Sequence, residues 1–135
     1  MPLDAKRFGW SPDFPILLKA VGGIGLLVSS LLFFRAYRDN PFLSALVRIQ
    51  IERKHAVVMT GVYGFIRHPM YLGGVLLFIF TPLLLGSIYG VLAGIIISLL
   101  IAGRIIGEER FLIKELEGYS DYKKKVKFRL IPLIW

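Results

Sequence analysis

The 135-residue sequence contains no cysteine, which excludes disulfide bonds, thiolate nucleophiles and cysteine-based metal sites. Its two histidines, His55 and His68, lack the spacing of metal ligands, so we expect no bound metal. The sequence has no nucleophilic serine motif and no glycine-rich phosphate loop. No basic surface interleaved with aromatic residues stands apart from the apolar segments, so we expect no nucleic-acid binding. Any chemistry therefore rests on other polar groups.

Three long apolar segments dominate the composition, which is 56% hydrophobic with a mean hydropathy of +0.66. They cover residues 15–34, 71–85 and 88–106. An apolar run of about 20 residues spans a bilayer as a helix. The second run approaches this length if its helix begins at Pro69, because proline is favoured at the first helical position. The sequence predicts an all-α integral membrane protein with three transmembrane helices, the last two forming a hairpin with its turn at 86–87.

The net charge of +8 is distributed unevenly along the chain. Basic residues concentrate between the first two apolar segments and in the tail after residue 103. The positive-inside rule places both regions in the cytoplasm, and the N-terminus and the 86–87 turn outside. The same residues attract anionic membrane lipid. We expect residence in a membrane, specifically a prokaryotic cytoplasmic membrane, with the active site facing the cytoplasm.

The chain is expected to have two parts, residues 1–47 with the first transmembrane helix and an interfacial region, and residues 48–135 with the hairpin and the tail. The first ten residues show no short apolar core followed by a cleavage site, so we expect the first apolar segment to be retained. A turn is expected at 39–41, and residues 42–54 are interpreted as an interfacial segment. The third helix should continue to about residue 116 and end before Gly118.

Polar residues gather where the second apolar segment begins and where the third ends. The first group lies in the run GVYGFIRHPMYLGG at 61–74, and the second is Glu108–Glu109. A helical hairpin would bring both groups to one membrane face. Arg67 next to a helix start can hold a carboxylate, since free N–H groups and a guanidinium fork both favour anions. The alternative is that Arg67 anchors a lipid headgroup and His68 caps the helix.

The tyrosines and the acidic pair each have two interpretations. Tyr63 and Tyr71 are either interfacial aromatic residues or the walls of a pocket for an adenine ring or a cationic group. Glu108 and Glu109 are costly if they face lipid, so at least one should face a partner or a polar cavity. That partner is either an arginine or a ligand whose ribose hydroxyls or sulfonium a carboxylate can bind.

Together with Tyr119, Tyr122 and the run RLIP at 129–132, these residues resemble the isoprenylcysteine carboxyl methyltransferase family and the related phospholipid N-methyltransferases. The resemblance covers roughly residues 48–132. It implies a helical membrane enzyme that uses S-adenosylmethionine and methylates a lipid-like or small apolar acceptor, such as a prenylcysteine carboxylate. Methyl transfer from a sulfonium is an in-line displacement that needs alignment more than a nucleophilic side chain.

The resemblance also implies roles for individual residues. Arg67, Glu108 and Glu109 are the expected catalytic residues, with Arg67 orienting the acceptor or the carboxylate of the cofactor. The expected cofactor-binding residues are Gly61, Tyr63, His68, Pro69, Tyr71, Glu109, Leu130 and Pro132. Which of the two glutamates faces the cofactor is open. The better-known family members have more than three spans, which favours a homodimer here and leaves open whether the acceptor is a prenylcysteine, a phospholipid amine, a small thiol or an isoprenoid.

Two other functions fit parts of the pattern. Membrane NADPH-dependent reductases of the steroid-reductase kind resemble the RHP-type run and the glutamate pair. A non-enzymatic small membrane subunit could use the same charged ends to dock a partner. Binding of S-adenosylmethionine, of NADPH or of neither discriminates among the three.

Overall fold

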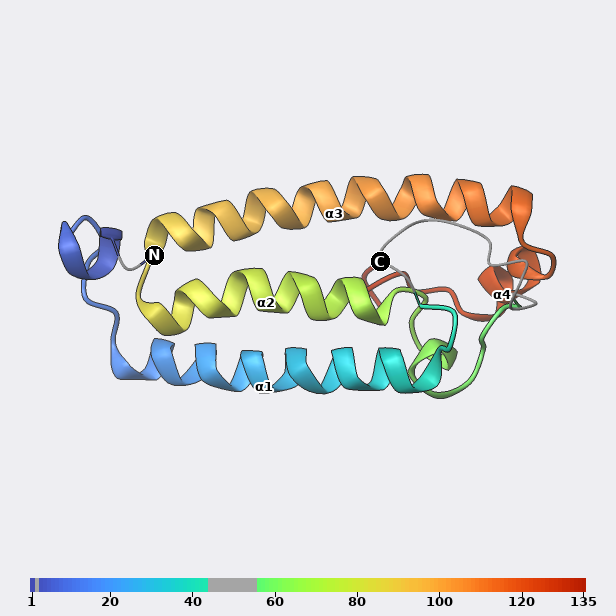
Figure 1. Cartoon of the computed structure of the whole chain (residues 1–135), viewed down its shortest axis with the longest axis horizontal. Helices are drawn as coiled ribbons and strands as arrows, with labels where there is room; N and C mark the ends of the chain where they lie inside the picture. The colour runs from blue at the N-terminus through green and yellow to red at the C-terminus, as the bar shows by residue number, and fades with distance from the viewer. Residues whose placement is uncertain (2, 44–55) are drawn as a thin grey trace. The chain divides into compact units, whose positions relative to one another are not determined.

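The computed structural model describes residue 1, residues 3–43 and residues 56–135, and these residues form helices and turns without a strand (Figure 1). This confirms the all-α class for the described part of the chain. The elements are η1 Leu3–Arg7, α1 Ile16–Asp39, η3 Gly61–Gly64, α2 Pro69–Leu85, α3 Ile88–Glu115 and α4 Tyr119–Lys125. They divide into two compact units, Met1–Leu31 with Gly73–Ile101, and Leu32–Leu72 with Ala102–Trp135.

The helix boundaries agree with the sequence patterns at most points. Helix α2 begins at Pro69, and α3 continues to Glu115. Helix α1 ends at Asp39, five residues beyond the apolar run, because the polar residues after it continue the helix and Arg35 pairs with Asp39 at 3.4 Å across one turn. The boundary expected at residues 47–48 and most of the expected interfacial segment lie outside the described residues, so both stay predictions.

Helices α1 and α3 are long and apolar enough to cross a membrane, with mean hydropathies of 2.1 and 2.2 over their most apolar windows. Only 17% and 11% of these windows are buried within the protein, and Ile24, Leu27 and Leu99 are each more than 60% exposed. Exposed apolar surface on this scale is expected to face lipid. Helix α2 is shorter, at 17 residues, so the third span stays a prediction.

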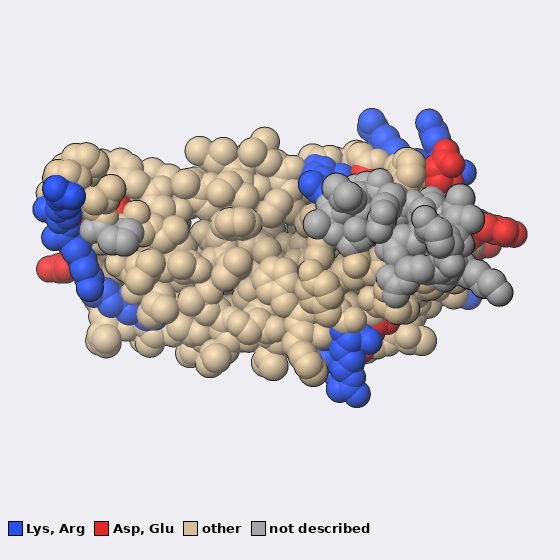
Figure 2. Space-filling model, viewed as in Figure 1, with Lys and Arg blue, Asp and Glu red and all other residues tan. Residues whose placement is uncertain are grey.

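In the first unit, small residues let the helices approach closely. Gly94 of α3 lies against the backbone carbonyl of Phe78 in α2, so a side chain at this position would overlap that carbonyl. Ser29 of α1 donates a hydrogen bond of 2.7 Å to the carbonyl of Gly73. On the face drawn in Figure 2, this helical part carries no charged side chain apart from those near the N-terminus.

The N-terminal segment contains a short π-helical turn and a buried acid, Asp4. Asp4 accepts hydrogen bonds from Ser87 at 2.5 Å and Ser11 at 2.9 Å. These hydrogen bonds, of which that from Ser87 has the largest effect, and the nearby N-terminal amine lower the pKa of Asp4 to about 2. Ser11 in turn accepts from the backbone N–H of Ile88, so this segment caps the start of α3.

The second unit is held by a small core under α4. The buried side chains of Leu116, Tyr119, Tyr122 and Val126 pack together, and Val57 and Leu112 cover them. The core connects the end of α3 to the segment that precedes α2. It therefore fixes the parts of the chain that carry the sequence motifs.

Candidate active site

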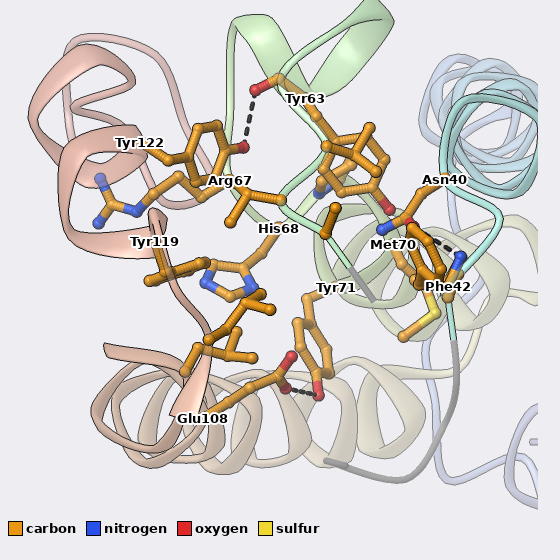
Figure 3. Close-up of a pocket in the computed structure, with 17 residues that line it drawn as sticks. Asn40, Phe42, Tyr63, Arg67, His68, Met70, Tyr71, Glu108, Tyr119 and Tyr122 are labelled. Carbon is orange, nitrogen blue, oxygen red and sulfur yellow. Dashed lines mark hydrogen bonds between the residues drawn. The ribbon is translucent and has the colours of Figure 1, made fainter. Parts of the chain in front are cut away.

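The second unit contains a cavity at the place where the sequence motifs meet (Figure 3). Its unfilled space is about 750 Å³ when the opening to solvent is included. Of the residues expected from sequence to form the site, Tyr63, Arg67, His68, Pro69, Tyr71 and Glu108 line it. Gly61, Glu109, Leu130 and Pro132 are not among the described lining residues.

Gly61 shapes the turn that leads into the motif. Its φ of 59° lies in the left-handed region, and a side chain there would overlap the carboxylate of Asp39. That carboxylate accepts a 2.9 Å hydrogen bond from the N–H of Val62. The turn places Tyr63 in the wall of the cavity, where burial raises the pKa of its hydroxyl to about 12.

Arg67 is buried at the centre of a network of hydrogen bonds. Its Nε donates to Glu109 Oε1 at 2.6 Å, and its Nη1 donates to the carbonyls of Val126 at 2.6 Å and Lys127 at 2.9 Å. The side chain is 3% exposed. A residue enclosed in this way is not a lipid-headgroup anchor, which removes one of the two interpretations from sequence.

The two adjacent glutamates have different surroundings. Glu109 accepts from Arg67, from His68 Nε2 at 3.2 Å and from Arg129 Nε at 3.0 Å, and it is 2% exposed. Glu108 lines the cavity and accepts a 2.6 Å hydrogen bond from the Tyr71 hydroxyl. The difference arises because successive helical residues point about 100° apart.

The Glu109 carboxylate also sets the hydrogen-bonding state of His68. An ionised carboxylate only accepts, so His68 Nε2 carries the proton of this pair. In the neutral ring Nδ1 is then an acceptor. The ring lines the cavity (Figure 3). Its centroid lies 5.7 Å from that of the Tyr71 ring.

The segment after α4 supports the motif from outside the cavity. The backbone N–H groups of Arg67 and His68 donate to the carbonyls of Phe128 and Arg129, each at 3.0 Å. The Arg129 guanidinium lies 4.9 Å from the centre of the Trp135 ring. The RLIP run at 129–132 therefore supports the backbone of the Arg67–His68 loop and is not among the described residues that line the cavity.

Several cavity residues were not identified as site residues from the sequence. They are Asn40, Phe42, Leu43, Ala56, Val57, Val58, Met70, Leu112, Leu116, Tyr119 and Tyr122. The spacing of Leu112 and Leu116 from Glu108, at four and eight residues, is a signal that could have placed them on one helix face. The residues after α1 gave no such signal, because irregular backbone brings them to the cavity.

Among the described residues no group of three or more His, Asp or Glu side chains could hold a metal ion.

Comparisons with known proteins identify the family of the chain. The sequence model of the isoprenylcysteine carboxyl methyltransferase (ICMT) family matches residues 44–114, which include the Arg67–His68 loop and both glutamates. The chain is 32% identical over 93 residues to the protein-S-isoprenylcysteine O-methyltransferase of Schizosaccharomyces pombe, and 38% identical over 85 residues to that of Saccharomyces cerevisiae.

These matches cover 67% and 62% of this chain, but 39% and 36% of the two relatives. The chain belongs to the isoprenylcysteine carboxyl methyltransferase family. The resemblance inferred from the motifs is thereby confirmed. The chain spans about two fifths of the length of these curated relatives, so the activity of the whole relatives is carried over below as a proposal.

Proposed function

We propose that this protein transfers a methyl group from S-adenosylmethionine to a lipid-like or small apolar acceptor. The observation that carries the proposal is the cavity lined jointly by the Arg67–His68 loop and Glu108, within the segment that matches the family. Both yeast relatives are named as O-methyltransferases of S-isoprenylcysteine, so a prenylcysteine carboxylate is the first acceptor to test.

The residues of the cavity suit an S-adenosyl ligand. Phe42, Tyr63 and Tyr71 offer aromatic faces for an adenine ring and for a positively charged sulfonium. Glu108 adds a carboxylate that can accept hydrogen bonds from hydroxyl or ammonium groups.

Bound S-adenosylmethionine supplies an electrophilic methyl group on sulfur. The protein residues have to align the acceptor, exclude water and stabilise charge, since no side-chain nucleophile is needed. Arg67 is suited to hold a carboxylate of the acceptor or the cofactor, because it lines the cavity and its position is fixed by Glu109. Mostly aromatic and aliphatic lining residues limit the access of water.

The proposal includes a membrane arrangement. Three spans, an external N-terminus and a cytoplasmic site follow from the distribution of basic residues. A homodimer that completes the lipid-facing side of the site stays a prediction from sequence. Residence in a prokaryotic membrane stays a prediction from sequence, and both relatives named here are from yeasts.

Cysteine labelling tests the orientation, because the native sequence has no cysteine background. Asp13 and Lys124 are exposed and lie on opposite sides of the predicted spans. We expect Asp13→Cys to react with an impermeant maleimide in intact cells, and Lys124→Cys to react only after permeabilisation. The reverse pattern would place the site on the outer face.

Calorimetry on detergent-solubilised protein tests the ligand. We expect one S-adenosylhomocysteine per chain and no heat from NADPH. Glu108→Gln should weaken binding by about tenfold or more, since hydrogen bonds to a charged acceptor contribute about 1.5–3 kcal/mol. Binding of NADPH in place of S-adenosylhomocysteine would favour the reductase alternative, and binding of neither would favour the subunit.

A further inference from the structure

Residues 130–135, called here the C-terminal turn, expose a group of neighbouring apolar side chains. Ile131, Leu133 and Ile134 are 43%, 89% and 77% exposed, whereas Leu130 before them is buried. Single exposed apolar side chains are common on proteins, but a group of large ones usually marks a surface that contacts another molecule. The question is therefore what covers these three side chains.

The C-terminal turn is ordered by its own hydrogen bonds. The backbone N–H groups of residues 129–131 donate to the carbonyl oxygen of Trp135 at 2.9, 3.0 and 3.1 Å, respectively. The N–H groups of Ile134 and Trp135 donate in return to the carbonyl of Ile131, each at 3.1 Å. Leu133 at the tip has a φ of 69°, in the left-handed region that leucine rarely adopts. A closed turn thus holds the apolar side chains outward.

The C-terminal turn lies at the level where helix α2 begins. Immediately before the turn, the carbonyls of Phe128 and Arg129 accept hydrogen bonds from the N–H groups of Arg67 and His68, each at 3.0 Å. Helix α2 begins at the next residue, Pro69, and Figure 1 shows the C-terminus beside this helix start. The start of a membrane-spanning helix marks the boundary between water and the hydrocarbon core. The exposed side chains of the turn are therefore within reach of that core.

The residues around the exposed side chains are typical of a membrane interface. The half-buried Trp135 ring lies 4.9 Å from the Arg129 guanidinium, and tryptophan is enriched where a bilayer meets water. Exposed lysines precede the turn and can attract anionic headgroups; they are Lys124, Lys125 and Lys127. A symmetric contact with a second copy would bring these same lysines together, and like charges oppose such a contact. The charges therefore favour lipid over a second copy.

We propose that the C-terminal turn inserts Ile131, Leu133 and Ile134 into the lipid leaflet on the side of the cavity, with the exposed lysines on anionic headgroups. The inference rests on the membrane arrangement proposed above. Because the residues just before the turn are bonded to the Arg67–His68 loop, the insertion holds a wall of the cavity at the membrane surface. An acceptor dissolved in lipid and a cofactor dissolved in water can both reach a site at this depth.

Site-specific fluorescence tests the insertion, because the native sequence has no cysteine. Leu133→Cys and Ile134→Cys are each labelled with an environment-sensitive dye and placed in nanodiscs of phosphatidylcholine and phosphatidylglycerol. Leu99→Cys, at a position of α3 that is 68% exposed, is the control for lipid, and Glu117→Cys, at an exposed acidic position after α3, is the control for water. We expect the labels on the turn to emit at shorter wavelength than the label on Glu117→Cys. Nitroxide-bearing lipids should quench them, and aqueous iodide should not.

Two results would overturn the inference while leaving the membrane arrangement intact. Iodide quenching of the labels on the turn as strong as that of Glu117→Cys would place the turn in water. Shielding from both quenchers, lost when each nanodisc holds a single chain, would assign the turn to a contact with a second copy. In both cases the label on Leu99→Cys is still quenched by nitroxide-bearing lipids. If iodide also quenches that label, the membrane arrangement itself fails, and the inference with it.

Discussion

Glu109→Ala is expected to destabilise the folded protein by about 3–5 kcal/mol, because it leaves a buried guanidinium without its counter-charge. Glu109 is bonded to Arg67, His68 and Arg129, and the Arg67 side chain is 3% exposed. Loss of the carboxylate removes the group that joins α3 to the loop before α2 and to the segment after α4. We expect the segment after α4 to become sensitive to protease below the melting temperature.

The neighbouring glutamate provides the matched control. Glu108→Ala removes one hydrogen bond, from Tyr71, at a residue that lines the cavity. We expect it to lower stability less than Glu109→Ala does, because it leaves no buried cation without a counter-charge, and to lower ligand affinity. Thermal and denaturant unfolding in detergent, with limited proteolysis, measure the difference. Equal stability of the two variants would show that the buried network does not hold the site together.

Arg67→Lys is expected to reduce methyl transfer at least about 100-fold, a loss comparable to that from misplacing reacting groups by about 1 Å. The guanidinium donates through Nε to Glu109 and through Nη1 to two carbonyls, and a single ammonium cannot reproduce this planar arrangement. The positive charge is kept, so membrane orientation should not change. Folding should be weakened less than by Glu109→Ala, because no charge is left without a counter-ion.

The measurement for Arg67→Lys is transfer of a labelled methyl group from S-adenosylmethionine, at matched amounts of folded protein. Arg38→Lys is a suitable control, because Arg38 is exposed and is not among the described residues that line the cavity. Its rate should equal that of the wild type. A wild-type rate for Arg67→Lys would show that neither the geometry of the guanidinium nor its position matters for the reaction.

The sequence predicted the helices well because their signals are local. Pro69 marks the start of α2, and Gly86 and Ser87 separate α2 from α3. The proximity of Arg67 to the glutamate pair was also predicted, from a hairpin of two helices. The sequence could not predict which glutamate binds Arg67 and which lines the cavity. This depends on how α3 is rotated around its axis, which tertiary packing fixes.

Irregular segments were the least predictable part. Asp4 lies in an N-terminal segment whose sequence has no hydrophobic periodicity. Its hydrogen-bond partner Ser87 is 83 residues away in the sequence. Leu130 and Pro132 belong to the RLIP run at 129–132. Backbone hydrogen bonds from Arg67 and His68 to the carbonyls of residues 128 and 129 hold this run against the loop, on the side away from the cavity.

The methyltransferase assignment is tested most directly by incubating the wild-type protein with labelled S-adenosylmethionine, N-acetyl-S-farnesylcysteine and a membrane lipid extract. We predict that label enters an apolar product, as a base-labile ester if the acceptor is the prenylcysteine carboxylate, and that Glu108→Gln transfers at most about a tenth as much. Absence of label from every acceptor fraction, with the protein shown to be folded by its melting transition, would contradict the assignment.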